Sequence, residues 1–478
     1  MKRSVYLLIL AISFFIAFFV DTSYFNVSGA KVLLAMGILL PILFIFYKDD
    51  NNDIRRVYFR PVHLFLLSFV IVFFQMPVDI LLGYNSSYYL VGRVDLMPES
   101  VRVALLGLIA FLLGYIVKKG NDTQVNNINT LGFLPAPVTI YKLLTSVMLV
   151  GIFVFIPKSV LFGGYHTTEM ETSGYNYLAS WCSVFYCAFF IQYTINLKLK
   201  GIGRGWSITQ MIKDIGWWQN TNIAIYLLLI LNLGDRGPMI FVIMIYYIVY
   251  LIVTGICPSR KTLITGMVIG VFFVAFLGYS KKYRDNNSIF ERINTTWEAN
   301  PYEDLQESVV PATYELSTSY RCLSYSVEDI QRFGNYGYGK YQLTYIVSVI
   351  PFAAGLFGLR NITSTYISHL IQGDFLSYGN GTSIIADFYL DFGLAGVIIF
   401  MFIFGYYVRK FDLVLFSNKK ASLFLYCCAF YFSFHFISIP RNYLLLNLKY
   451  AVWLTIIIYL YQKLSNRGVL IKKKETEK

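Results

Sequence analysis

The chain has 478 residues, of which 56% are hydrophobic and only 14% are charged. A soluble domain carries about 25% charged residues, so this composition excludes an ordinary soluble protein and indicates one embedded in a membrane. The net charge of +13 is spread over short loops between apolar runs. A nucleic-acid-binding protein instead gathers its Lys and Arg on one face or in one domain, so no nucleic-acid partner is expected.

Twelve apolar runs follow one another along the chain, and each is close to the length of about 20 residues that crosses a bilayer as a helix. The predicted transmembrane helices cover residues 4–20, 30–47, 62–83, 101–117, 141–162, 174–195, 221–233, 238–255, 262–279, 383–408, 421–439 and 443–462. The run at 221–233 is short, and its helix is expected to begin earlier, in "IGWWQN", because Trp favours the membrane–water interface. The first run shows no signal-peptide cleavage site and is expected to be retained as a helix.

The basic residues set the predicted topology. Most Lys and Arg fall in segments such as "KDDNNDIRRVYFR", "NLKLKGIGRG" and "KKKETEK", which lie inside if both termini are cytoplasmic, as the positive-inside rule requires. The predicted organisation is nine helices in 1–279, a large extracytoplasmic loop at 280–382, three helices in 383–463 and a basic cytoplasmic tail at 464–478.

Within the large loop, "YQLTYIVSVIPFAAGLFGL" (341–359) is apolar enough for another span. Counting it as one would move the last lysine-rich segments outside, against the charge rule. We therefore expect short surface or re-entrant helices there, broken at Pro351 and Gly355. The predicted fold class is an all-α polytopic membrane protein with about twelve spans and one large outer loop.

The six cysteines lie mostly inside apolar runs, without a CxxC pair or a zinc-like His spacing. They are predicted to be small core residues. No metal site is predicted.

Ionisable residues at membrane depth or at its outer edge are the candidates for function, because each costs about 2.5–3.5 kcal/mol to insert. Arg236, in "LNLGDRGPMI", sits in a tight turn whose backbone amides and guanidinium could bind an anion; a surface turn with Asp235 is the alternative. Arg441 occupies a similar outer turn after Pro440, and the two arginines are predicted to converge. Arg284, in "GYSKKYRDN", lies at an outer helix end, where it either complements the helix dipole or faces a lipid phosphate.

The stretch from His369 to Gly396, "HLIQGDFLSYGNGTSIIADFYLDFGLAG", mixes polar and apolar residues. His369 has a side chain suited to proton transfer near neutral pH, although a lone histidine is often structural. Asp387 and Asp391 are four residues apart and share a helix face, where they could pair with an arginine or act on a substrate. Thr382 or Ser383 is the expected N-cap of this helix.

Three short motifs, "GDRGPMIF", "NGTSIIADFYLDFGLAGVIIF" and "PRNYL", resemble the bacterial O-antigen and oligosaccharide repeat-unit polymerases of the Wzy type. The order of spans with a large outer loop late in the chain resembles them over the whole length. The resemblance implies a GT-C-like membrane glycosyltransferase of the bacterial cytoplasmic (inner) membrane. It would move a growing glycan from a polyprenyl diphosphate carrier to the non-reducing end of a new lipid-linked repeat unit at the outer face.

The resemblance also implies roles for particular residues and partners. Outer-loop arginines hold the diphosphates in this family, and we carry this role onto Arg236, Arg284 and Arg441, with Arg321 and Arg360 as further candidates. His369 is the first candidate for the catalytic base, with Asp374 or Asp387 in reserve. The implied partners are undecaprenyl-diphosphate-linked oligosaccharides, the lipid bilayer and, as candidates, a chain-length regulator and a flippase.

The expected mechanism is inverting and metal-independent, with no cofactor. The first outer loop holds only Asp21 and no acidic pair, and bidentate guanidinium contacts can stabilise a departing diphosphate without a metal.

Two other functions remain open from the sequence. An O-antigen ligase would have a similar architecture and differ in its acceptor. A lipid-linked oligosaccharide flippase or another transporter would also have about twelve spans, but it would place more charges in mid-span and keep its outer loops short.

Overall fold

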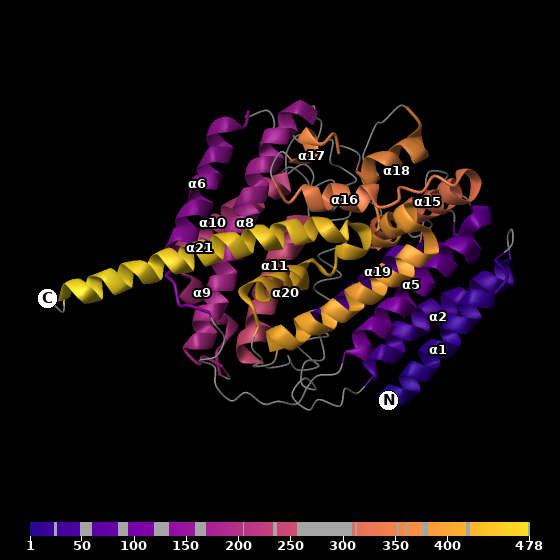
Figure 1. Cartoon of the computed structure of the whole chain (residues 1–478), viewed down its shortest axis with the longest axis horizontal. Coiled ribbons are helices and arrows are strands. Elements are labelled where there is room, and N and C mark those ends of the chain that lie inside the picture. The colour runs from indigo at the N-terminus through magenta and orange to yellow at the C-terminus, as the bar shows by residue number, and fades with distance from the viewer. Residues whose placement is uncertain are drawn as a thin grey trace, which may run out of the picture. The chain divides into compact units, whose positions relative to one another are not determined.

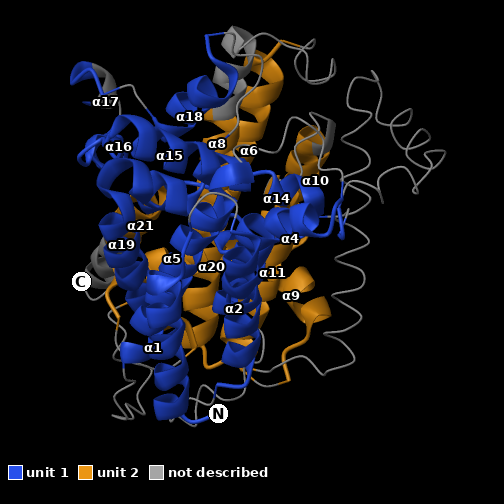
Figure 2. Ribbon diagram, turned by 90° about the vertical axis from the view of Figure 1, so that its right-hand side faces the viewer, with its two compact units in different colours: residues 1–123, 301–413, 435–449 blue, residues 124–300, 414–434, 450–478 orange. Residues whose placement is uncertain are grey.

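The computed structural model describes residues 1–22, 26–47, 60–84, 94–118, 133–157, 169–203, 205–232, 237–255, 308–310, 313–350, 353–359, 362–374, 381–416 and 421–476. Within these ranges all regular structure is helical (Figure 1). The chain forms two compact units, each assembled from three separate segments (Figure 2). Unit 1 contains residues 1–123, 301–413 and 435–449, and unit 2 contains residues 124–300, 414–434 and 450–478.

Unit 1 holds the N-terminal helices and the short helices of the late loop. Its elements are α1 (Arg3–Phe19), α2 (Val27–Ile45), α3 (Pro61–Val70), η2 (Ile71–Gln75), α4 (Met76–Leu81), η3 (Val94–Leu96), α5 (Met97–Val117), α14 (Tyr314–Ser317), α15 (Tyr320–Phe333), α16 (Lys340–Val347), α17 (Ala353–Leu356), α18 (Thr363–Gln372), most of α19 (Ile384–Phe416), η7 (Ile439–Arg441) and the start of α21 (Leu444–Thr476).

Unit 2 is built from the middle of the chain and from the ends of the last helices. Its elements are α6 (Thr139–Phe155), α8 (Glu169–Leu199), α9 (Ile208–Ile215), α10 (Trp217–Asn232), α11 (Gly237–Thr254), nearly all of α20 (Leu423–His435) and most of α21. In its core α6 packs against α8 and α10. A buried hydrogen bond of 2.9 Å joins Gln462 on α21 to Gln192 on α8.

Helices are found at every predicted span that falls within the described residues, while the span at 262–279 lies outside them. The helix at 221–233 begins at Trp217, as predicted from its tryptophans. Among the described residues, 6 helices are long and apolar enough to cross a membrane: Val27–Ile45, Pro61–Leu81, Val94–Val117, Tyr177–Leu199, Ile384–Phe416 and Leu444–Asn466. The protein is therefore an all-helical, multi-pass membrane protein; the count of twelve spans and the GT-C-like fold stay predictions.

The core of unit 1 is organised around α5, most of whose side chains are buried. It packs against α1 and α2 (Figure 1). Aromatic rings fill the space around it, with the rings of Phe65 and Phe111 only 4.4 Å apart. At Gly114 of α5 and Gly405 of α19 an added Cβ would collide with the backbone of the other helix. The two glycines therefore allow α5 and α19 to cross in direct backbone contact.

α19 contains a break at Gly393, whose φ is +62° and whose ψ is −155°. Gly393 ends one helical segment and starts another. Positive φ is readily adopted only by glycine. The helix begins as predicted at Ser383, whose hydroxyl accepts the Ala386 N–H at 3.2 Å.

The late loop is helical in its described part. The apolar segment 341–359 divides into α16 and α17, and α16 has 8 residues, so it extends only about 12 Å. It is too short to cross a membrane, as expected for a surface or re-entrant helix. The break at Pro351 lies outside the described residues, and Gly355 lies within α17 rather than at a break.

The start of the described loop is fastened to α3–η2–α4. The buried Asp79 carboxylate accepts the Ser308 hydroxyl at 2.7 Å and the Val309 N–H at 2.9 Å. Gln75, the last residue of the π-helical η2, exchanges hydrogen bonds with Ser308 and Thr313. A π-helical turn shifts side chains out of the α-helical register, and here it presents Gln75 and Asp79 to the same returning segment.

Five of the six cysteines lie within the described residues; all five are buried, and none of them forms a disulfide with another described cysteine. This confirms their predicted role as core residues. Cys257 lies outside the described residues.

Candidate functional site

Two arginines and an aspartate predicted from the sequence lie within electrostatic range of the thiol of Cys322 in unit 1. Arg321 and Cys322 begin α15, Arg441 ends η7, and Asp387 lies in the first turn of α19. Burial raises the pKa of the Cys322 thiol to about 12; the charges of Arg321 and Arg441 lower this pKa and the Asp387 charge raises it. Three charged groups from three distant parts of the sequence thus act on one sulfur atom.

The position of Asp387 is fixed by hydroxyl groups. Its carboxylate accepts the Thr382 hydroxyl at 2.7 Å and also forms a hydrogen bond with Thr363. Thr363, the first residue of α18, shares a hydrogen bond of 2.6 Å with the Tyr345 hydroxyl. Asp387 is 2% exposed, so these hydroxyls supply hydrogen bonds to a carboxyl group that is removed from water.

Tyrosines line the same region. The rings of Tyr345 and Tyr443 lie 4.6 Å apart, and Asp387 acts electrostatically on both hydroxyls. Burial above all, and then the Asp387 charge, hold the pKa of Tyr345 well above its ordinary value. Both hydroxyls therefore remain protonated and can donate hydrogen bonds near neutral pH.

Asp391, one helical turn after Asp387, has a structural role. Its carboxylate accepts backbone N–H groups of Gly339 at 3.2 Å, Tyr341 at 3.3 Å and Gln342 at 2.9 Å. These donors lie at the N-terminus of α16, where backbone N–H groups lack partners within the helix. Asp391 thus caps α16 from α19, and the two aspartates of the motif have different tasks.

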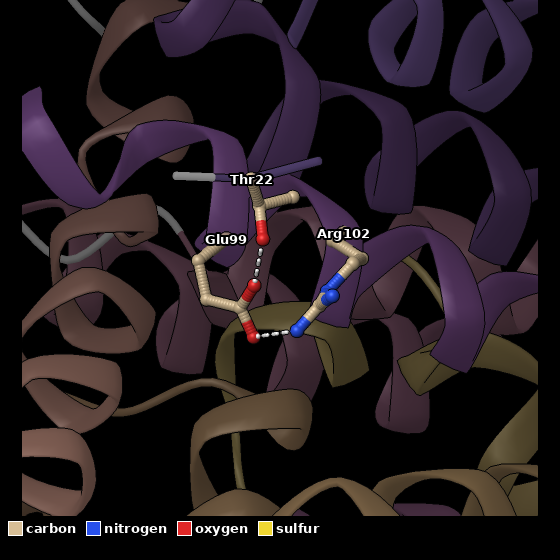
Figure 3. Close-up of polar contacts among 3 residues, drawn as sticks. All are labelled: Thr22, Glu99 and Arg102. Atoms are coloured by element: carbon tan, nitrogen blue, oxygen red, sulfur yellow. Dashed lines mark hydrogen bonds and ion pairs between the residues drawn. The ribbon is translucent and has the colours of Figure 1, made fainter. Parts of the chain in front are cut away.

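A second charged cluster lies at the N-terminal end of α5 (Figure 3). Glu99 accepts the Thr22 hydroxyl at 2.7 Å through one oxygen and the Arg102 guanidinium at 2.7 Å through the other. Tyr389 of α19 lies within electrostatic range of Glu99, Arg102 and Tyr336. The cluster therefore links α5 with the first part of α19 and with the segment that follows α15.

The structure separates the two leading candidates for the catalytic base. His369 is exposed near the end of α18, and its Nδ1 lies 3.2 Å from the carbonyl oxygen of Gly373. Asp374 follows as another exposed residue. Thr363, at the opposite end of the same helix, is the α18 residue that contacts Asp387. Asp387 thus acts on the same Cys322 thiol as the two arginines, whereas the described contact of His369 is at the C-terminus of α18. The catalytic roles of His369, Asp374 and Asp387 stay predictions.

Three predicted arginines, Arg236, Arg284 and Arg360, lie outside the described residues. The predicted convergence of Arg236 with Arg441 therefore remains a prediction.

Sequence reasoning missed the neutral groups of the site. Thr363 and Tyr345 carry no charge, and nothing in their local sequence pattern distinguishes them from other Thr and Tyr residues of the loop. The Glu99–Arg102 pair was detectable, because Glu99 follows Pro98 at the start of a predicted span and Arg102 comes three residues later. An ion pair at this spacing lies on one helix face.

The arrangement is suited to binding an anion and an alcohol together. Two guanidinium groups can each form paired hydrogen bonds with phosphate oxygens. A carboxylate and neutral tyrosine and threonine hydroxyls can accept from and donate to sugar hydroxyls.

Comparison with known proteins gives the family. No curated protein and no solved structure shows a significant match. The family model of the O-antigen polysaccharide polymerase Wzy matches residues 4–467. The match covers almost the whole chain and includes every charged group described above. This chain belongs to the O-antigen polysaccharide polymerase Wzy family of membrane proteins.

Proposed function

We propose that the protein polymerises lipid-linked oligosaccharide repeat units at the outer face of the bacterial cytoplasmic membrane, and that the charged cluster around Cys322 is its reaction site. The observation that supports this proposal is that the charges of Arg321, Arg441 and Asp387 all act on one thiol, that of Cys322, in unit 1. The family supplies the general activity, and the chemistry of these three groups supports the particular reaction.

In the proposed step, a hydroxyl at the non-reducing end of the new repeat unit attacks the anomeric carbon of the growing glycan. The new glycosidic C–O bond forms as the bond between the anomeric carbon and the diphosphate oxygen breaks. The undecaprenyl diphosphate leaves with the bonding electrons, and the hydroxyl proton passes to a base. A single displacement of this kind inverts the configuration at the anomeric carbon.

Each charged group has a task in this step. Arg321 and Arg441 stabilise the negative charge that grows on the diphosphate as it leaves. Asp387, fixed by Thr382 and Thr363, orients the attacking hydroxyl and is the candidate acceptor of its proton. His369 remains the other candidate base. No metal or cofactor is assigned a role.

Complementation of a strain that lacks the gene tests the arginines. Arg321→Ala and Arg441→Ala should each leave single repeat units on the acceptor, because loss of one charge-stabilising donor costs about 10²–10³ in rate. The matched control is Arg332→Ala, on the same helix, since Arg332 is a half-exposed residue paired with Glu328 at 2.9 Å. Its glycan ladder should match the wild type.

The outcomes separate the competing functions. Normal ladders from either arginine variant remove that residue from the site. Complete absence of repeat units outside the membrane in the deletion strain favours a flippase, and finished polymer retained on its carrier lipid favours a ligase. Thermal melting of the purified variants separates loss of chemistry from loss of folding, because a purely structural arginine would lower the melting temperature along with the ladder.

A further inference from the structure

A pair of exposed tyrosines follows α15 in the sequence "GNYGYG" (334–339). Tyr338 is 82% exposed and Tyr336 is 38% exposed, and their rings lie 5.9 Å apart. We define this pair as the tyrosine platform. No side chain of the described residues covers the greater part of the Tyr338 ring.

The platform is held in place through its backbone. The N–H of Gly337 donates to the Leu390 carbonyl at 2.8 Å, and the N–H of Tyr338 donates to the Asp391 carbonyl at 3.0 Å. The ring of Tyr336 lies against Gly393, where an added methyl group would approach within 3.0 Å. The exposed rings are therefore mounted on the break in α19 and are not carried by a loose loop.

Tyr338 occupies a backbone position that disfavours it. Its φ is +50°, the following Gly339 has a φ of +88°, and the Lys340 N–H donates to the Gly337 carbonyl at 3.0 Å. Two successive positive φ angles closed by this hydrogen bond are typical of a type I′ turn, which favours Asn, Asp or Gly at its first central position. Among the described residues, Tyr338 is the non-glycine residue with positive φ. Tyr338 is 82% exposed, so contact with the Tyr336 ring offsets only part of this strain, and the remaining strain points to a ligand.

The chemistry around the rings identifies the ligand class. Exposed polar residues flank the two tyrosines in the sequence: Gln331, Asn335 and Lys340. Tyr336, Glu99 and Arg102 all lie within electrostatic range of Tyr389 on α19. Aromatic rings edged by hydrogen-bonding groups fit a sugar, which has apolar faces and a rim of hydroxyls. A ring used only as a bilayer anchor would not require this polar rim or a fixed turn.

We propose that the tyrosine platform is a glycan-binding subsite, at which the pyranose rings of the polysaccharide stack on Tyr338 while the chemistry proceeds near Asp387. The identity of the glycan rests on the proposed function. The geometry links the two places directly, because Asp391, whose carbonyl and carboxylate hold the platform, lies one helical turn from Asp387 on α19.

The test uses Tyr338→Asn, which removes the ring and introduces a residue that the turn prefers. The full-length protein in nanodiscs is titrated with repeat-unit oligosaccharide released by mild acid from the carrier lipid of the producing strain, and binding is followed by saturation-transfer NMR. We expect Kd for this oligosaccharide to rise about fivefold to tenfold and glycan ladders to shorten, while the melting temperature stays equal or rises. Tyr338→Trp should bind as the wild type does, and so should Tyr177→Ala, which removes an exposed tyrosine of unit 2.

Two results overturn the proposal. One is an unchanged Kd and ladder in Tyr338→Asn. The other is quenching of the added tryptophan in Tyr338→Trp by brominated lipids, relative to wild type, which would place the ring in the bilayer. The binding titration requires no turnover, so its result is independent of the polymerase assay. If the protein binds the oligosaccharide through Tyr338 but does not polymerise it, the proposed function is rejected and the tyrosine platform is retained. If it polymerises repeat units but Tyr338→Asn leaves Kd and ladder unchanged, the platform is rejected and the proposed function is retained.

Discussion

Replacing Asp391 with asparagine is predicted to destabilise unit 1, although the change removes no packing volume. In the structure one carboxylate oxygen accepts the N–H groups of Gly339 and Tyr341, and the other accepts the N–H of Gln342. Asparagine keeps a single acceptor oxygen, so at least the Gln342 N–H loses its partner and faces an amide NH₂. A buried hydrogen bond to a charged group contributes about 1.5–3 kcal/mol, and an unsatisfied buried donor costs about 1–3 kcal/mol.

Together with weaker bonds to the remaining oxygen, these terms give a loss of about 2–4 kcal/mol for Asp391→Asn. The assay is thermal unfolding of the purified protein in detergent, followed by intrinsic fluorescence, with limited proteolysis at the turn that carries Tyr338. The melting temperature should fall by several degrees and cleavage at this turn should accelerate. Asp374→Asn, at an exposed aspartate of the same loop, should change neither. Wild-type melting and proteolysis in Asp391→Asn would refute the capping role.

Two further variants test packing and the site thiol. Gly405→Ala should destabilise the protein by about 1–3 kcal/mol, because the new Cβ meets the Phe111 backbone and no rotamer change can relieve the contact. The control is Gly151→Ala, whose Cβ would make only ordinary contacts of 3.8 Å and 3.9 Å. In the same melting assay this control should be neutral or stabilising by about 0.5–1 kcal/mol. The pKa of Cys322 is raised from 9.0 to about 12, so its stabilising effect is fully present below pH 9 and is lost as the pH rises toward 12, where the unfolded chain releases the proton first. Mass spectrometry after maleimide treatment of native membranes at pH 7.5 should find Cys322 unmodified, and rapid labelling there would contradict its burial.

The helices of this protein follow from the sequence because the physical signal is strong. Long apolar runs can satisfy their backbone in lipid only as helices, and the structure places helices at the predicted runs, including the early start of α10 at Trp217. In the segment 341–359 the described residues form two short helices, α16 and α17; that this segment does not span the membrane stays a prediction, based on the charge asymmetry of the neighbouring segments.

The site was predictable only in part, for an equally physical reason. A charge beside or within apolar sequence stands out, and this is how Arg441 and Asp387 were selected, whereas Arg321 was a further candidate implied by the family resemblance. Their grouping around Cys322 depends on tertiary packing of α15, α19 and η7, and sequence spacing does not contain it. Asp387 and Asp391 look equivalent in the sequence, and their different tasks come from what faces them: hydroxyl groups in one case and the N-terminus of α16 in the other.

The break at Gly393 changes what the apolar helix α19 must accommodate. An unbroken helix from Ile384 would carry Asp387 and Asp391 toward the hydrocarbon. With the break, residues 394–416 alone extend roughly 35 Å at 1.5 Å per residue, which suffices for a hydrocarbon layer of about 30 Å. Just before the break, the carbonyl groups of Leu390 and Asp391 accept the N–H groups of Gly337 and Tyr338. The glycine that bends the helix thus also marks the place where the loop docks on it.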